Sequence, residues 1–238
     1  MLDVIALGFD PKKTHFIVDT VHANLMYPEA LKVAKRITFS TVKAAFGLNN
    51  ESNIGSIFYT SMQAVPAFLP SVLKKKKIPC LIPHAIDQDP HFRVSRDVIP
   101  KLGYYKPASI QCRFLPGLAG LEKDGKMSAS EASTAIYTTD NPKTVKKKIN
   151  KYAFSGGQAT VEEHRKKGGN PNIDVAYQWL VFFEKDDKKL EKIYKDYKSG
   201  KLLSGELKAI LIEKLNTFLK EHQKKRKLAA KKIDKFML

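Results

Sequence analysis

The hydrophobic pattern of this 238-residue chain changes near residue 130, and this change limits the folds that the chain can adopt. Before that point, short apolar runs alternate with amphipathic stretches and are separated by Pro and Gly. Short apolar runs, here at residues 15–19, 80–83 and 108–114, are typical of buried strands. Because amphipathic stretches lie between them, the pattern predicts an α/β region with a parallel sheet and helical crossovers.

After residue 130 the pattern is almost entirely helical and rich in lysine. Asn141 and Pro142 predict a helix start, because a capping side chain precedes a residue that fits the first helical turn. Apolar residues recur at helical spacing from Leu190 and again from Leu207. Residues 175–183 are apolar on nearly every side, which predicts the central, buried helix of a small bundle.

The charge of the chain indicates a polyanionic partner. The formal net charge is +18 and the pI is about 9.7, which favours binding to nucleic acid or to an anionic membrane surface. Residues 201–238 carry eleven Lys or Arg and four Asp or Glu, a net charge of +7, with a basic run at 224–227. That run also fits a solvated helix face, so both interpretations stay open. A second basic run, at 74–77, is interpreted as a loop tip.

Other features of the sequence argue against several classes of protein. Two cysteines, Cys80 and Cys112, cannot make a disulfide framework and lack the spacing of a Cys/His metal cluster. We therefore expect no protein metal site and a reducing, cytoplasmic location. Asp3 near the start, with no basic lead, argues against a signal peptide. Residues 52–73 are uncharged but include two prolines, so no membrane-spanning segment is expected.

One short motif points to phosphate chemistry. A lysine and two hydroxyl side chains, Lys126, Ser128 and Ser130, follow Gly125 in the run Gly-Lys-Met-Ser-Ala-Ser. An ammonium group and hydroxyl donors on a loop can stabilise the charge that develops on the phosphates of a nucleoside triphosphate. The glycine spacing of a Walker A loop is absent, and an ordinary polar turn is the competing interpretation.

The context of this motif resembles one family. Lys-Met-Ser-Ala-Ser resembles the second signature of class I aminoacyl-tRNA synthetases, and residues 80–97 look like the segment that closes the amino-acid pocket in tryptophanyl-tRNA synthetases of the eukaryotic and archaeal type. Four further segments resemble that family in the same order, at residues 153–157, 160–165, 168–170 and 204–207. The resemblance therefore extends over essentially the whole chain.

The resemblance implies a fold and a domain organisation. Residues 1–130 would form the later half of the catalytic domain, a partial Rossmann-type parallel sheet that ends in the signature loop. Residues 131–238 would form an all-helical anticodon-binding domain with a basic tail. The family's first signature, His-Ile-Gly-His or a close variant, does not occur in the sequence. We therefore expect that a separate N-terminal half completes the site, that the chain is a fragment, or that it serves another purpose.

The resemblance also implies roles for individual residues. Gln63, Gln88 and Phe92 would bind tryptophan, since side-chain amides can orient an amino acid and an aromatic surface accepts an indole. Residues implied to bind ATP, with Mg²⁺ as part of the substrate complex, are Ile82, Pro83, Ala85, Lys126, Met127, Ser128 and Ser130. Of these, Lys126, Ser128 and Ser130 would act in catalysis.

The implied function is ATP-dependent ligation of tryptophan to its tRNA through tryptophanyl-adenylate. The partners would be tRNA, tryptophan and ATP, with a homodimer expected and no membrane. Gly156, Gly157 and Gln158 would lie in the anticodon region, but Gln158 and Ala159 stand where we expect an Arg-Asp pair. Alanine cannot accept hydrogen bonds from base amino groups. This departure supports the alternative of a catalytically silent, synthetase-like RNA-binding protein, and a tyrosine-specific relative is a third interpretation.

Overall fold

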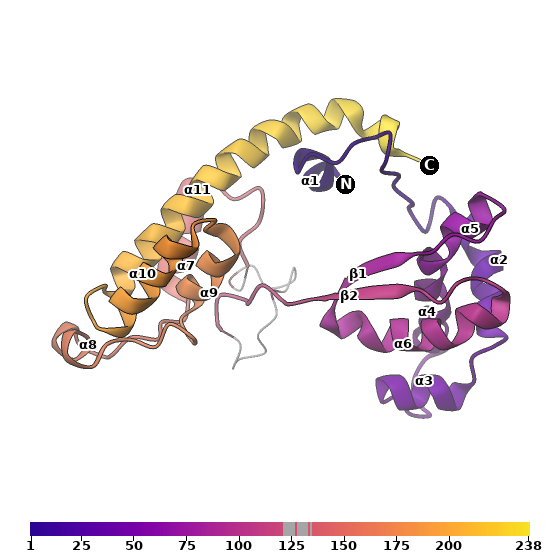
Figure 1. Ribbon diagram of the computed structural model, residues 1–238, viewed down its shortest axis with the longest axis horizontal. Helices are drawn as coiled ribbons and strands as arrows, with labels where there is room; N and C mark the ends of the chain where they lie inside the picture. The colour runs from indigo at the N-terminus through magenta and orange to yellow at the C-terminus, as the bar shows by residue number, and fades with distance from the viewer. Residues whose placement is uncertain (121–126, 128–132, 134) are drawn as a thin grey trace. The chain divides into compact units, whose positions relative to one another are not determined.

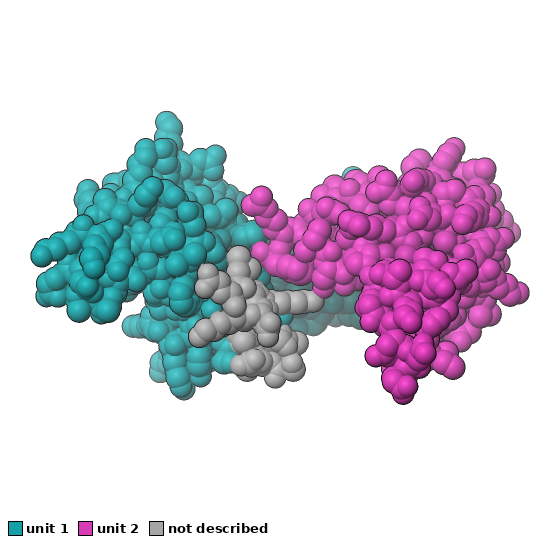
Figure 2. Space-filling model, turned by 90° about the horizontal axis from the view of Figure 1, so that it is seen from below, with its two compact units in different colours: residues 1–16, 115–238 teal, residues 17–114 magenta. Residues whose placement is uncertain are grey.

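The computed structural model describes residues 1–120, 127, 133 and 135–238. It contains two compact units (Figure 2), one formed by Ile17–Phe114 and the other by Met1–Phe16 together with Leu115–Leu238. We call the first the sheet unit and the second the helical unit. Packing thus places a unit boundary at 114/115, whereas the domain boundary at residue 130 stays a prediction based on the signature loop.

The sheet unit contains a parallel sheet of two strands, β1 (Leu81–Ala85) and β2 (Ala108–Cys112), paired in register from Leu81 with Ala108 to Ala85 with Cys112. The crossover between them contains the 3₁₀ helix η2 (Ile86–Gln88), α6 (Asp89–Val98) and the 3₁₀ helix η3 (Ile99–Leu102). Two of the three predicted strands and the α/β class are therefore confirmed (Figure 1).

Helices precede the sheet in this unit. Their bounds are Ala23–Ala34 for α2, Phe39–Phe46 for α3, Ile54–Ala64 for α4, Val65–Ala67 for the 3₁₀ helix η1 and Leu69–Leu73 for α5. The core combines α2, α4, η1 and α6, with Met26, Phe68 and Ile99 almost completely buried. Gly47 ends α3 and Gly103 ends η3, both at positive φ, a conformation that side chains with a Cβ disfavour.

The third predicted strand, at 15–19, is wrong. Phe16 makes only an isolated bridge with Met237, and its N–H donates to the carbonyl of Phe236 at 2.6 Å. The two phenylalanine rings stack with centroids 5.4 Å apart. The apolar side chains of this segment therefore find their partners at the C-terminal end of the chain. They pack in a small cluster with Ile5 of α1 (Leu2–Ala6) and Ala229.

The helical unit contains the predicted helices of the second part. Their bounds are Pro142–Tyr152 for α7, Val161–Lys167 for α8, Val175–Phe183 for α9, Asp187–Lys198 for α10, Ser204–Ala229 for α11 and Ala230–Phe236 for the 3₁₀ helix η4. Asn141 caps α7 as predicted, since its side chain accepts a hydrogen bond from the N–H of Thr144 at 2.9 Å. Within the described residues, no helix is long and apolar enough to cross a membrane.

Helix α9 is central but buried on one face only. Trp179 and Leu180 are almost completely buried, and the indole N–H of Trp179 donates to the carbonyl of Pro116 at 2.8 Å. Val181 and Phe182 are about half exposed. The prediction of a fully buried helix is therefore correct for one face and wrong for the other, because the bundle covers only one side of these nine residues.

Candidate functional site

Two glutamines predicted to bind the amino acid lie together in the sheet unit. Gln63 is near the end of α4, and Gln88 is the last residue of η2, directly after β1. The side-chain N–H of Gln63 donates to the side-chain oxygen of Gln88 at 3.3 Å. Because each amide has further donor or acceptor capacity, the pair presents both an acceptor and a donor to a small polar ligand.

Phe92 lies one helical turn after Gln88 on α6. Its side chain is only 4% exposed, and its ring stacks on the imidazole of His84 with centroids 4.7 Å apart. The structure therefore brings Phe92 to the same end of β1 as the glutamine pair. It also places most of the ring in the core, where Phe92 serves packing in addition to any contact with a ligand.

His84 is a polar residue of this region that sequence reasoning missed. It is buried, its Nδ1 lies 3.0 Å from the carbonyl of Ala85, and its Nε2 has no partner among the described residues. A buried nitrogen without a partner costs free energy of unfolding, on the order of 1–3 kcal/mol. The available signal was a histidine inside a run that otherwise predicts a buried strand.

His91 was also missed, and it connects the two helices that bear on the glutamine pair. Its Nδ1 lies 3.2 Å from the hydroxyl of Thr60 on α4, and its ring lies 4.3 Å from that of Phe46 on α3. Burial lowers the pKa of His91, so the imidazole is neutral at pH 7. This neutral contact holds α4 against α6 close to Gln63.

The strand residues predicted to receive adenine divide between the two faces of the sheet. Ile82 is half-buried and packs against the core, on the face of β1 that His84 also occupies. Pro83 is exposed and Ala85 is half-buried on the opposite face. The structure thus brings Pro83 and Ala85 together and directs the side chain of Ile82 elsewhere.

The signature residues Lys126, Ser128 and Ser130 lie outside the described residues, so their roles stay predictions. Met127 is described, and its half-buried side chain packs against the core of the helical unit.

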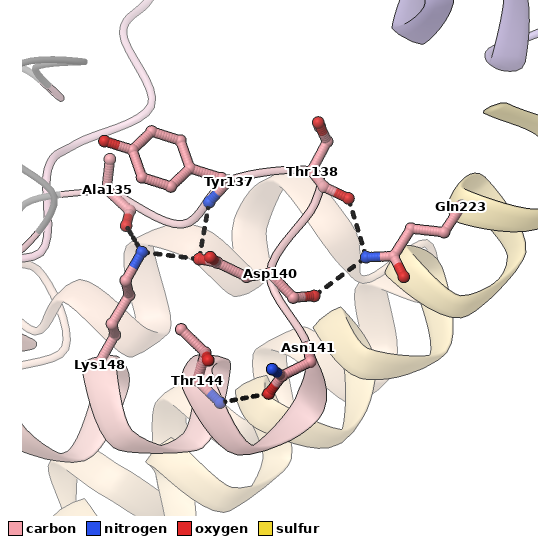
Figure 3. Close-up of polar contacts among 8 residues, drawn as sticks. All are labelled: Ala135, Tyr137, Thr138, Asp140, Asn141, Thr144, Lys148 and Gln223. Carbon is pink, nitrogen blue, oxygen red and sulfur yellow. Dashed lines mark hydrogen bonds and ion pairs between the residues drawn. The ribbon is translucent and has the colours of Figure 1, made fainter. Parts of the chain in front are cut away.

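The segment that follows the signature is held by two side chains (Figure 3). The ammonium group of Lys148 donates to the carbonyl of Ala135 at 3.0 Å and to the carboxylate of Asp140 at 2.7 Å. Gln223 of α11 donates to the carbonyls of Thr138 and Asp140, at 2.9 and 3.0 Å.

The predicted anticodon region lies in the helical unit, at a point of close backbone packing. The N–H of Gly156 donates to the carboxylate of Asp174 at 2.9 Å, and its carbonyl accepts from the N–H of Asn170 at 2.7 Å. A Cβ at Gly156 would overlap the carbonyl oxygen of Asn170, and a Cβ at Gly157 would overlap the hydroxyl of Ser204. Packing therefore explains both glycines without any ligand.

Asp174 organises this region, although sequence reasoning did not single it out. Its carboxylate is 1% exposed and accepts hydrogen bonds from the N–H groups of Gly156, Ala176 and Tyr177 and from the hydroxyl of Tyr197. Burial raises the pKa of Tyr197 above its ordinary value. A capping signal was present, because an acidic residue stands directly before the apolar run of α9.

Gln158 lies beside an open groove of about 440 Å³ between α8 and the start of α11. Its side chain donates to the carbonyl of Gly168 at 3.0 Å, and its N–H donates to Nδ1 of His164 at 3.5 Å. Since Nε2 of His164 donates to the carbonyl of Leu202 at 3.0 Å, the imidazole is the neutral Nε2–H tautomer. Gln158 is therefore engaged with backbone, and Ala159 adds no polar group to the groove.

Neither unit contains a dedicated cation site in its described part. There, no group of three or more His, Cys, Asp or Glu side chains is arranged to hold a metal ion.

Comparison with known proteins gives one consistent family. The family model described as tRNA synthetases class I (W and Y) matches residues 1–220. The tryptophan--tRNA ligase of Sulfolobus acidocaldarius is 56% identical over 237 residues, covering 99% of this chain and 60% of that protein, and the one of Thermococcus onnurineus is 53% identical, covering 99% and 59%. The chain therefore spans about 60% of the length of the curated relatives that it matches.

Solved structures agree with this result. The tryptophanyl-tRNA synthetase of Giardia lamblia has a TM-score of 0.89 and 38% identity, covering all of this chain and 66% of its own. The enzyme from Plasmodium falciparum has a TM-score of 0.86 and 41% identity, covering all of this chain and 64% of its own.

Proposed function

This chain belongs to the class I tRNA synthetases for tryptophan and tyrosine, and from that membership we propose that it takes part in ATP-dependent ligation of tryptophan to its tRNA. The observation that carries the proposal is the hydrogen bond between Gln63 and Gln88. It joins two amides that the sequence resemblance assigns to one amino-acid pocket, although they are 25 residues apart. The similarity to curated proteins named as tryptophan ligases favours tryptophan over tyrosine.

In the proposed reaction, the carboxylate of tryptophan attacks the α-phosphorus of ATP, which gives tryptophanyl-adenylate and releases pyrophosphate. A hydroxyl of the tRNA end then attacks the activated carbonyl, and AMP leaves. Gln63 and Gln88 would orient tryptophan, and Phe92 would support the indole. Lys126, Ser128 and Ser130 would stabilise negative charge on the phosphates, with Mg²⁺ entering as part of the ATP substrate.

We propose in addition that a separate polypeptide completes this site. The first signature of the family, with its two histidines, does not occur in the sequence, and those imidazoles would face the phosphates at a helix start. Association into homodimers and a cytoplasmic location belong to the same proposal. The free thiols of Cys80 and Cys112 support a reducing compartment.

The proposal is tested by exchange of labelled pyrophosphate into ATP. The chain is assayed alone and after refolding with the N-terminal region of the Sulfolobus acidocaldarius relative that it does not match. We expect exchange only in the mixture, dependent on tryptophan and not supported by tyrosine. A Gln88→Ala variant should raise the KM for tryptophan more than tenfold. A mixture that forms a stable complex but does not exchange would contradict the proposal, as would equal activity with tyrosine.

A second candidate function is binding of RNA without catalysis. It is favoured by the Gln158-Ala159 pair, because Gln158 donates to the backbone and Ala159 has no polar group for a base. This candidate predicts that the chain binds tRNA with a linear decrease of log affinity against log salt concentration, while no complemented mixture exchanges pyrophosphate. Exchange in the mixture would exclude it.

A further inference from the structure

A basic groove in the helical unit has no part in the site described above. Its floor and one wall are the C-terminal half of α11, where Lys220, Lys224 and Lys227 recur at i, i+4 and i+7 on one helix face. All three side chains are exposed. At 1.5 Å of rise per residue, they extend over about 10 Å of helix. We call this feature the α11 groove.

The opposite wall of the α11 groove is the turn before α7, with Asp140 and Pro142. Gln223 of α11 donates to the carbonyls of Thr138 and Asp140, which ties this turn to the helix (Figure 3). The groove is therefore built between two tied segments, with a volume of about 550 Å³. A second hollow of about 460 Å³ shares Gln223 and Lys227 with it.

The charges around the α11 groove leave a net positive lining. Its carboxylate, Asp140, is paired with Lys148 at 2.7 Å, and both side chains are nearly buried. Among the described residues, no carboxylate pairs with Lys220, Lys224 or Lys227. Three ammonium groups thus face one concave surface whose acidic group is already neutralised, an arrangement that favours a ligand with several spaced negative charges.

We propose that the α11 groove binds the sugar-phosphate backbone of RNA, as a site separate from Gly156, Gly157 and Gln158. Lysines in a row bind successive phosphates as point charges, and the hydroxyl of Thr217 adds a donor or acceptor for ribose. A lipid surface is a poorer fit, because the lysines surround a hollow whose apolar member, Leu219, is buried. The inference rests on the proposed function in one respect, since tRNA is the RNA that this function supplies.

The test compares two triple variants of the full chain with equal loss of charge. The first is Lys220→Gln, Lys224→Gln and Lys227→Gln. The control is Lys74→Gln, Lys76→Gln and Lys77→Gln, on exposed residues of the sheet unit. Binding to a tRNA transcript and to a single-stranded RNA of unrelated sequence is measured by fluorescence anisotropy between 50 and 200 mM salt, with circular dichroism to verify folding.

We expect the groove variant to bind both RNAs at least about tenfold more weakly at 100 mM salt, with a salt slope smaller by about 2–3 because three phosphate contacts are lost. The control variant should keep most of the affinity and slope. Equal weakening in both variants would overturn the proposal, since it would show an effect of net charge alone. Unchanged RNA binding with lost binding to phosphatidylserine vesicles would also overturn it. Pyrophosphate exchange needs no RNA, so its failure would count against the proposed function and not against the groove.

Discussion

At the scale of single residues, function and packing compete for the same positions in the helical unit. The Ser-Gly-Gly segment belongs to the family resemblance, yet Gly156 is required by packing because a Cβ there would overlap the carbonyl of Asn170. We expect Gly156→Ala to lower the free energy of unfolding by about 1–3 kcal/mol through overpacking. Urea unfolding followed by fluorescence of Trp179, the single tryptophan, measures this in the same unit.

A matched control is available on α11. A Cβ at Gly205 would meet no atom within 4 Å, and the residue is helical, so Gly205→Ala should raise the free energy of unfolding by up to about 1 kcal/mol. Equal urea midpoints for the two alanine variants would show that the segment relaxes around Gly156 at no cost.

The hydroxyl of Tyr197 gives a second prediction at this scale. Burial raises the pKa of Tyr197, so its neutral form stabilises the fold below the ordinary pKa near 10, and this contribution is lost as the pH rises beyond that value. Tyr197→Phe should lower stability at pH 7 by about 1–3 kcal/mol, because the carboxylate of Asp174 loses a donor. It should also flatten the loss of stability between pH 9 and 11. A Tyr197→Phe curve parallel to that of the wild type in this range would contradict the assignment.

Among elements, those with local signals were predictable from the sequence. Asn141 before Pro142, and leucines four residues apart in α11, predict helices because the signal and the structure involve neighbouring residues. Segment 15–19 was not predictable, since an apolar run does not say whether it pairs with a sheet or packs on Phe236 more than 200 residues away. The contact of Gln63 with Gln88 came within reach only through family resemblance, and His84 and His91 show their importance only through tertiary neighbours.

Helix α1 depends on one such distant contact. The carboxylate of Asp3 accepts from Nε2 of His222 at 2.8 Å and from Nε of Arg226 at 3.1 Å, both on α11. The hydrogen bond from His222 is the main reason that the pKa of Asp3 is lowered, despite partial burial. Its stabilising effect is therefore present above the ordinary pKa near 4 and is lost as the pH falls through the lowered value.

Asp3→Asn should loosen α1 without unfolding α11. Loss of a half-exposed ion pair of about 0.5–1 kcal/mol corresponds to a two- to fivefold faster amide hydrogen exchange in residues 2–6 at pH 7. Asp10→Asn is the matched control, because Asp10 accepts only a local bond from the N–H of Lys12. Exchange that is equally fast in both variants would show that the contact to His222 and Arg226 does not hold the helix.

For the whole molecule, the two units have separate buried cores. Phe68 belongs to the core of the sheet unit, and Leu211 and Trp179 belong to the core of the helical unit. A family member must keep both units folded, because the predicted amino-acid pocket lies in one and the predicted RNA contacts lie in the other. Since each core is a separate source of apolar stabilisation, we expect the units to unfold in separate steps.

This expectation is tested with one substitution in each core. Phe68→Ala should destabilise the sheet unit by about 3–5 kcal/mol and shift part of the circular dichroism transition to lower urea, while the Trp179 fluorescence transition stays unchanged. Leu211→Ala should move the fluorescence transition by about 2–5 kcal/mol, because Leu211 and Trp179 share a core. If Phe68→Ala shifts the fluorescence midpoint as much as Leu211→Ala does, the cores unfold together. Loss of the amino-acid pocket would then also remove the RNA-binding surface, and a variant lacking one activity could not be assigned to one unit.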